Sequence, residues 1–432
     1  MSEVPGAGSP GLAPVTPGSG PAEPSPDLAP PGSGPAPTGS GPVTPSPTPA
    51  PTGSGPAAPG SGPPAAGSGL PAPGVSYRDA GVDIAAGEAA VDRIRHLATS
   101  TARPEVLGGI GGFGGCFALP PGRYRQPVLV AGTDGVGTKM QVARAAGRFG
   151  TIGIDLVAMC VDDLVCVGAE PLFLLDYLAV GRLDPDQVEQ VVEGIADGCR
   201  QAGCALLGGE MAEHPGVLAD GDVDVAGFAV GVVEADERLG PERVQAGDVL
   251  VGLASPGLRS NGYSLARRVL LGPDDRPAGE VAAALAAPAW EGAPRSLADE
   301  LLLPSVIYAP AVLAVLRQLG PGPLRVAAHV TGGGIAGNLA RVIGPAADGV
   351  VDVGTWTVPR IFEEIRRRGP VDDAELAAVF NLGLGMVLVL APDAVDSAVG
   401  VLAGAGHDAV VVGRVEPGRG QVHLRGRWPW SA

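Results

Sequence analysis

Lysine is nearly absent from this sequence. Lys139 is the only lysine among 29 basic residues, and every other basic position is arginine. Exposed basic sites accept either residue, so the one retained lysine indicates a position that needs a compact ammonium group. We expect Lys139 to face solvent, to bind an anion and to contribute little to stability. The alternative is chance survival of one surface lysine in an arginine-biased composition.

Paired cysteines and an excess of basic charge are also absent. The five cysteines are odd in number and include no C-x-x-C pair, which disfavours a disulfide framework and a zinc site. Reduced thiols in a cytoplasmic protein are the simpler interpretation. The formal net charge of −17 argues against a nucleic-acid partner, because proteins that bind polyanions usually carry a basic face.

No apolar run is long and uninterrupted enough for a membrane span, so we expect no membrane partner. Residues 1–74 are almost wholly Gly, Pro, Ala, Ser and Thr, with only three acidic residues. Such a segment has too little apolar surface to offset the entropy of ordering, and we expect a disordered tail that is not a signal peptide. The remainder is long enough for two domains, which we place at 75–242 and 243–428.

The stretch AGTDGVGTK at residues 131–139 is the most informative in the chain. The apolar run before it predicts a strand that delivers Asp134 to its C-terminal end. Gly135 and Gly137 let the following backbone approach a ligand closely. A phosphate and a metal ion would suit this loop.

A second group of acids accompanies a predicted helix at 154–164. Its apolar residues have helical spacing, which places Asp155, Asp162 and Asp163 beside the apolar stripe. Carboxylates on such a helix need partners, and a divalent cation carrying nucleotide phosphates would provide one. The competing interpretation is that at least one of the three is a cap or a solvated residue.

Predicted strands and helices alternate along the rest of the chain, which indicates an α/β fold. We expect strands at 172–180, 223–233, 249–254, 326–330, 387–390 and 409–415, with a further strand-to-glycine junction at 205–213. We expect helices at 91–98, 188–199, 335–342, 361–368 and 394–403, and a loop at 273–295.

Three further segments carry polar residues beside glycines. The glycine-rich stretch 108–115 is a loop that lies against a ligand or serves as a flexible connector. In SPGLRSNGYS, Ser260 or Asn261 begins a helix whose free N–H groups would bind an anion. His329 opens HVTGGG and is placed to act as acid, base or phosphate donor, although a packing role is equally compatible.

Eight strings occur in order between residues 76 and 415: SYRDAGVDI, GGFGG, GTDGVGTK, IGIDLVAMCV, GAEPLFLLDY, DVAGFAVGVVE, SNGYSL and HVTGGGI. Each is weak alone, but the ordered set resembles the phosphoribosylformylglycinamidine cyclo-ligase family, also called AIR synthetase. The resemblance implies two α/β domains with mixed sheets, and N-terminal strands that pack across a homodimer. It also implies purine biosynthesis, in which ATP phosphorylates the formyl amide oxygen of formylglycinamidine ribonucleotide and nitrogen attack then closes the imidazole ring.

The resemblance assigns roles to named residues, with ATP and Mg²⁺ as cofactors. The metal ligands would be Asp134 and Asp163, with Asp155 or Asp162 as weaker candidates. The ATP phosphates would be bound by Gly111, Gly112, Gly114, Gly115, Thr133, Asp134, Gly135, Gly137, Thr138 and Lys139. The substrate or nucleotide would contact Ser260, Asn261, Thr331, Gly332 and Gly333. Proton handling would fall to His329, Glu210 and Glu213, beside Lys139 in catalysis.

The sequence departs from the family pattern at two sites. Leu382 and Leu384 stand in a segment where the family commonly reads FNCGVGM, so a thiol-dependent step is not available there. Asp162 stands where the family commonly has asparagine, which adds a carboxylate beside Asp163. A related ATP-using enzyme such as thiamine-monophosphate kinase, and a non-catalytic nucleotide-binding paralogue, are the alternatives.

Overall fold

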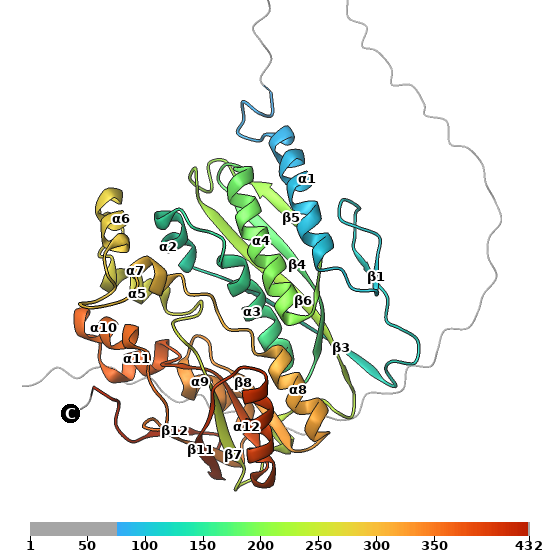
Figure 1. Cartoon of the computed structure of the whole chain (residues 1–432), viewed down its shortest axis with the longest axis vertical. Helices are drawn as coiled ribbons and strands as arrows, with labels where there is room; N and C mark the ends of the chain where they lie inside the picture. Colours follow the sequence, from blue (N-terminus) through green and yellow to red (C-terminus); the bar gives the residue numbers. More distant parts are fainter. Residues whose placement is uncertain (1–75, 431–432) are drawn as a thin grey trace, which may run out of the picture. The chain divides into compact units, whose positions relative to one another are not determined.

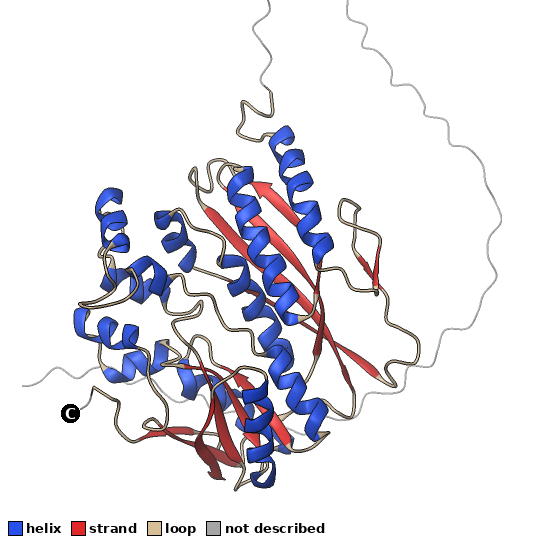
Figure 2. Ribbon diagram, in the orientation of Figure 1, coloured by secondary structure: helices blue, strands red, loops and turns tan. Residues whose placement is uncertain are grey.

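Two large β-sheets organise the chain (Figures 1 and 2). The computed structural model describes residues 76–430, so the tail expected at 1–74 lies outside the described residues. The first sheet has the order β3-β6-β4-β5 and the second the order β12-β9-β11-β7-β10-β8. The strands are β1 (Val106–Leu107), β2 (Cys116–Phe117), β3 (Pro127–Gly135), β4 (Glu170–Val180), β5 (Ala205–Glu213), β6 (Val223–Glu234), β7 (Val249–Ala254), β8 (Leu324–His329), β9 (Ala347–Asp352), β10 (Leu384–Leu390), β11 (Ala409–Pro417) and β12 (Val422–Arg425).

The helices are α1 (Ile84–Ser100), α2 (Lys139–Ala146), α3 (Ile152–Val165), α4 (Pro185–Ala202), α5 (Tyr263–Leu270), α6 (Ala278–Ala286), α7 (Leu297–Leu301), α8 (Ala309–Leu319), α9 (Gly334–Ile343), α10 (Arg360–Arg368), α11 (Asp373–Val379) and α12 (Val395–Gly404). The mixed α/β fold class is confirmed, as are the helices expected within α1, α3, α4, α9, α10 and α12. The loop expected at 273–295 is wrong in part because α6 forms there from an alanine-rich segment with high helix propensity. Strands β1, β2, β9 and β12 were not predicted.

A row of four residues crosses the first sheet at one level. Asp134 on β3 pairs with Gly227 on β6, Gly227 with Asp176 on β4, and Asp176 with Gly209 on β5. Helix α3 packs closely here, since a Cβ at Gly227 would lie 2.9 Å from Cys160 Sγ. The glycine therefore permits the close helix–sheet contact beside Asp134.

Strand β10 of the second sheet is covered on both faces. Side chains of β10 alternate between two buried clusters, one that includes α9 and one that includes α8 and α12. All seven residues of β10 are buried, which explains its continuous apolar sequence LGMVLVL.

One face of the first sheet is largely open within residues 76–430, although Phe117 of β2 packs on Phe173 there, with ring centroids 5.4 Å apart. Helices α1, α3 and α4 lie on the opposite face (Figure 1). The open face exposes large apolar side chains, with Leu129 60% exposed, Tyr177 40% and Phe228 43%. None of the described helices is both long and apolar enough to cross a bilayer.

Candidate active site

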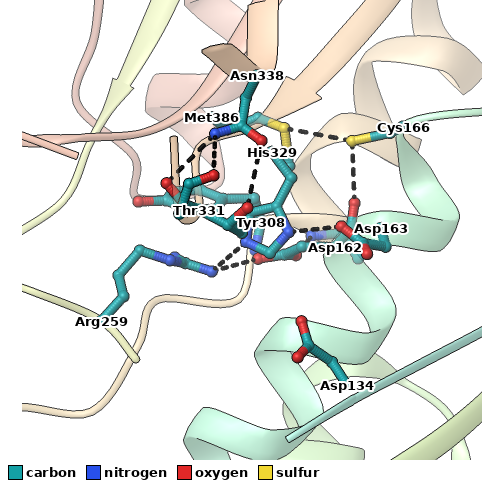
Figure 3. Close-up of polar contacts among 12 residues, drawn as sticks. Asp134, Asp162, Asp163, Cys166, Arg259, Tyr308, His329, Thr331, Asn338 and Met386 are labelled. Atoms are coloured by element: carbon teal, nitrogen blue, oxygen red, sulfur yellow. Dashed lines mark hydrogen bonds and ion pairs between the residues drawn. The ribbon is translucent and has the colours of Figure 1, made fainter. Parts of the chain in front are cut away.

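Asp163 on α3 contacts His329 on β8, and Asp134 at the end of β3 lies near this pair without a hydrogen bond to either residue (Figure 3). His329 Nδ1 lies 2.8 Å from Asp163 Oδ1. Burial raises the pKa of Asp134, and the negative charge of Asp163 raises it further. The structure thus brings together two carboxylates, from separate elements, whose charges repel.

These two carboxylates fit a magnesium ion that nucleotide phosphates also hold. Asp134 Oδ1 accepts the Gly135 N–H at 2.8 Å, and Asp163 Oδ1 contacts His329. The second oxygen of each carboxylate has no hydrogen-bond partner within residues 76–430. No group of three or more His, Cys, Asp or Glu side chains in that range could hold a metal ion. Mg²⁺ commonly uses one or two carboxylates and takes its other ligands from water and phosphate, so the donor set is suitable.

Asp155 and Asp162 have structural roles instead of the expected metal ligation. Both are fully buried. Asp155 Oδ1 accepts the backbone N–H of Ser305 at 2.8 Å and its hydroxyl at 2.6 Å. Asp162 Oδ1 accepts the N–H groups of Tyr308 and Ala309, at 2.8 and 3.0 Å, which are free donors at the start of α8. Their oxygens hold together elements that are distant in sequence.

The expectation that Lys139 faces solvent is wrong. Its side chain is 0% exposed, and Nζ lies 2.6 Å from Asp155 Oδ2. Nζ also donates to the carbonyl oxygens of Leu303, at 2.7 Å, and Arg259, at 3.1 Å. These three partners match the three ammonium hydrogens, so none remains for the phosphate that we expected Lys139 to bind.

The glycine-rich loop lies away from the two carboxylates, over a cavity of about 600 Å³. Gly111, Gly112, Gly114 and Gly115 line this cavity together with Glu210, while Asp134 and Asp163 do not. The inner face of α1 and parts of β4, β5 and α4 complete its walls. The expected phosphate-binding groups therefore fall into two sets, one at β3 and one at β5.

Asp176 lines the same cavity and was missed from sequence. No hydrogen bond or ion pair joins its side chain to another residue within residues 76–430. Burial raises its pKa to about 7, although a hydrogen bond from its own backbone N–H opposes the change. The available signal was an acid inside the apolar strand sequence LFLLDYLAV. Burial makes the ionised form of such a carboxylate energetically unfavourable.

Asp176→Asn should stabilise the folded protein at pH 8 by about 2–4 kcal/mol, a range reduced because the cavity is open to solvent. The wild-type Asp176 carboxyl is protonated in both states below the unfolded pKa of 3.8, so it does not oppose folding there. As the pH rises from 3.8 through about 7, the unfolded state loses its proton more readily than the folded state, and wild-type stability falls. The difference between variant and wild type should therefore shrink between pH 7 and pH 4. Urea unfolding at several pH values measures it, and a difference that is independent of pH would contradict the assignment.

Both carboxylate oxygens of Glu213 accept hydrogen bonds from backbone N–H groups, so this residue does not fit the expected proton-handling role. Its Oε2 accepts the N–H of Asp83 at 2.6 Å and its Oε1 the N–H of Leu183 at 2.8 Å. Asp83 is the N-cap of α1, so Glu213 anchors the start of that helix to the end of β5.

Ser260 and Asn261 remain candidates for ligand binding. Both Ser260 Oγ and Asn261 Oδ1 are buried and lack a hydrogen-bond partner in the described part of the chain. A Cβ at Gly332 would lie 3.9 Å from Asn261 Nδ2, so the loop that also contains Thr331 and Gly333 is adjacent. Unpaired buried polar atoms are uncommon in folded proteins and suit a ligand that would pair with them.

The remaining residues of the AGTDGVGTK stretch lie near Asp134 but do not by themselves form a phosphate-binding site. Thr133 Oγ1 donates to the carbonyl of Gly227 at 2.8 Å, and Thr138 Oγ1 is 3.1 Å from Ser264 Oγ. Strand β3 ends at Gly135, as the sequence predicted, so only residues 136–138 separate it from α2. Gly137 turns the chain there with φ +63°.

Leu382 has a packing role. It is fully buried, with φ +47°, and its carbonyl accepts the Trp356 Nε1–H at 2.8 Å. The carbonyl of Gly257 accepts a hydrogen bond from Asn381, the preceding residue, at 2.9 Å, which ties this turn to the segment before Ser260. A thiol at position 382 is thus not needed to complete this local structure.

Comparison with known proteins identifies the family on both halves of the chain. Residues 122–233 match the AIR synthase related protein, N-terminal domain, and residues 245–425 match the corresponding C-terminal domain. A phosphoribosylformylglycinamidine cyclo-ligase of Myxococcus xanthus (strain DK1622) is 55% identical over 346 residues, or 80% of this chain and 97% of the relative. The enzyme of that name from Sorangium cellulosum (strain So ce56) is 51% identical over 79% of this chain and 95% of the relative.

Solved structures resemble the chain at the level of fold. Thiamine-monophosphate kinase from Stenotrophomonas maltophilia K279a has a TM-score of 0.51 and 22% identity over 78% of this chain and 96% of the kinase. Hydrogenase maturation protein HypE in complex with ATP has a TM-score of 0.53 and 18% identity over 77% of this chain and 90% of that protein. The ordered strings and the two-sheet fold agree with the cyclo-ligase family. The sequence identities and the two matching domains show that this chain belongs to the phosphoribosylformylglycinamidine cyclo-ligase family of ligases.

Proposed function

We propose that this chain closes the imidazole ring of aminoimidazole ribonucleotide from formylglycinamidine ribonucleotide with ATP. The observation that carries the proposal is the Asp134–Asp163 pair, in which each carboxylate keeps one oxygen free. An amide oxygen is a poor leaving group until it is phosphorylated, and phosphoryl transfer needs charge neutralisation more than covalent catalysis by the protein. Family membership supports the same reaction.

In this proposal, Asp134 and Asp163 hold Mg²⁺, which would neutralise charge on the transferred phosphoryl group when bound. Ser260 and Asn261 pair their buried unsatisfied atoms with the substrate, beside the loop of Thr331, Gly332 and Gly333. The cysteines of residues 76–430 are all unpaired, which fits a cytoplasmic compartment.

Phosphate release by the purified protein tests this proposal. With Mg²⁺–ATP, phosphate should appear only when formylglycinamidine ribonucleotide is present, and in equal amount to the imidazole product. ATP hydrolysis coupled to thiamine monophosphate would instead favour a kinase, and nucleotide binding without turnover would favour a non-catalytic paralogue. The kinase resemblance is confined to the fold at 22% identity, so we rank it second.

We further propose that the chain forms a homodimer through the open face of the first sheet. That face exposes Leu129, Tyr177 and Phe228, and the side chains of neighbouring strands form one continuous surface. Apolar side chains gathered on one face mark interaction surfaces in soluble proteins. Light scattering should report twice the monomer mass for wild type and the monomer mass for Leu129→Arg/Phe228→Arg.

The dimer would also join the two separated sets of residues. Asp134 on edge strand β3 and Gly209 on edge strand β5 lie on the same row of the first sheet. A two-fold axis parallel to the strands would therefore set Glu210 of one copy level with Asp134 of the other. The glycine-rich loop lines the cavity beside Glu210 and would then approach the metal-binding carboxylates.

Mixed dimers test this arrangement. Asp134→Asn and Glu210→Gln should each be nearly inactive alone. When the two variants are mixed and allowed to exchange subunits, about a quarter of wild-type turnover should return, because about half of the dimers are mixed and each mixed dimer has one intact site of two. Absence of recovery, with exchange verified by mass spectrometry, would argue that each active site is built from one copy.

A further inference from the structure

Arg259 occupies a buried and strained position next to the candidate active site. It is 2% exposed, and its backbone lies in the left-handed region with φ +62°. Its Nη1 donates to the carbonyl of Val306 at 2.7 Å, and the guanidinium lies 4.9 Å from the centre of the Tyr308 ring. Its Nε–H is buried without a partner in the described residues. A non-glycine residue with these costs is usually held in place by a functional requirement.

The guanidinium links Asp162 to His329 (Figure 3). Arg259 Nη2 lies 3.0 Å from Asp162 Oδ2 and 2.9 Å from His329 Nε2. A guanidinium group donates hydrogen bonds but accepts none, so His329 Nε2 must offer a lone pair. The ring proton is therefore on Nδ1, which donates to Asp163 Oδ1 at 2.8 Å.

This tautomer determines what His329 can do. With its Nε2 lone pair turned to Arg259 and its Nδ1–H to Asp163, the ring has no free nitrogen for a substrate. The expected acid–base or phosphate-donor role for His329 therefore does not fit this arrangement. Its hydrogen bond instead fixes one oxygen of Asp163 and leaves the other available beside Asp134.

We propose that Arg259 is a positioning residue, which fixes the His329 tautomer and through it orients the Asp163 carboxylate for the metal ion. The metal itself rests on the proposed function, whereas the tautomer and the orientation do not. Without Arg259, Nε2 of His329 has no donor, and only the Asp163 hydrogen bond still favours the proton on Nδ1. The proton can then move to Nε2 when the Asp163 carboxylate turns away from the ring. Groups that orient a metal ligand through such a hydrogen bond typically change metal affinity by about 10–100-fold.

A purely structural alternative is that Arg259 only neutralises the buried charge of Asp162. Removing one member of a buried pair leaves an uncompensated charge and can unfold the protein, so Arg259→Met alone is not informative. Two variants separate the roles. Asp162→Asn keeps Arg259 beside His329, and Arg259→Met/Asp162→Asn removes both charges of the pair.

The first measurement is the tautomer in metal-free protein labelled with ¹⁵N-histidine. The chain has five histidines, so the spectrum is sparse, and His329→Gln assigns the signal. We expect Nδ1 of His329 to be protonated in wild type, Asp162→Asn and Arg259→Lys. We expect this signature to be lost in Arg259→Met/Asp162→Asn. A protonated Nε2 in wild type, or an unchanged tautomer in the double variant, would overturn the proposal.

The second measurement is binding of Mn²⁺, used as an oxygen-preferring probe and followed by paramagnetic resonance of the free ion. The dissociation constant should rise about tenfold in Arg259→Met/Asp162→Asn and stay near wild type in Asp162→Asn. Equal Mn²⁺ dissociation constants in the two variants would mean that Arg259 only neutralises the charge of Asp162. The tautomer measurement does not depend on turnover of formylglycinamidine ribonucleotide. The proposed function and the positioning role of Arg259 can therefore be contradicted independently of each other.

Discussion

Lys139→Met should lower the free energy of unfolding by about 3–5 kcal/mol, because it leaves Asp155 buried and uncompensated. The lysine is fully buried, and its Nζ lies 2.6 Å from Asp155 Oδ2. Burial lowers the pKa of Lys139, and Asp155 opposes that change by favouring the charged ammonium. Loss of the ammonium also leaves the carbonyls of Leu303 and Arg259 without this donor. Urea unfolding at pH 7.5 measures the effect.

Two further variants make the Lys139 prediction specific. Lys139→Met/Asp155→Asn removes both charges and retains an acceptor for Ser305, so it should recover much of the lost stability. Arg317→Met removes an exposed cation from α8 and should change stability by less than about 0.5 kcal/mol. Wild-type stability in Lys139→Met would restore a ligand-binding role for the lysine and would contradict the buried ion pair.

Asp163→Asn should reduce kcat by about a thousandfold, or about 4 kcal/mol of transition-state stabilisation. Asparagine keeps an oxygen that can accept the His329 Nδ1–H but loses the negative charge that would hold Mg²⁺. The hydrogen bond at 2.8 Å can therefore persist while metal binding fails. Steady-state kinetics across a range of Mg²⁺ concentrations should show a loss that added Mg²⁺ only partly restores.

Stability should move in the opposite direction from activity. The pKa of Asp134 is raised by burial and by the charge of Asp163. A raised carboxylate pKa means that the ionised form opposes folding above that pKa, so neutralising either acid relieves repulsion at pH 8. Metal-free Asp163→Asn should therefore be at least as stable as metal-free wild type. If metal-free Asp163→Asn were less stable than metal-free wild type, its loss of activity could be explained by unfolding, and the metal-site interpretation would be contradicted.

Sequence reasoning located the main elements and the central carboxylates. The period of the apolar residues predicted α1, α3, α4 and α9, since a helix must bury one stripe whatever it packs against. The apolar run before Thr133 likewise predicted β3, with Asp134 at its end. The ordered motifs were sufficient to indicate the family, which the comparisons confirm.

The roles of the charged residues depended on contacts that no local pattern encodes. Asp155, Asp162 and Asp163 lie on one helix, yet Asp155 pairs with Lys139, Asp162 binds the start of α8, and only Asp163 contacts His329. Their partners are more than 10 residues away in every case, and one helix turn changes which partner a side chain meets.

The sequence by itself determined the fold class, the family and the presence of a carboxylate at the end of β3. Periodicity and local propensity carry that information because they act over a few residues. Tertiary structure alone decided that Lys139 is buried, that Arg259 contacts His329, and that the glycine-rich loop and Asp134 lie at opposite edges of one sheet. Burial and pairing of charges depend on which distant segments meet, and that is settled only when the whole chain folds.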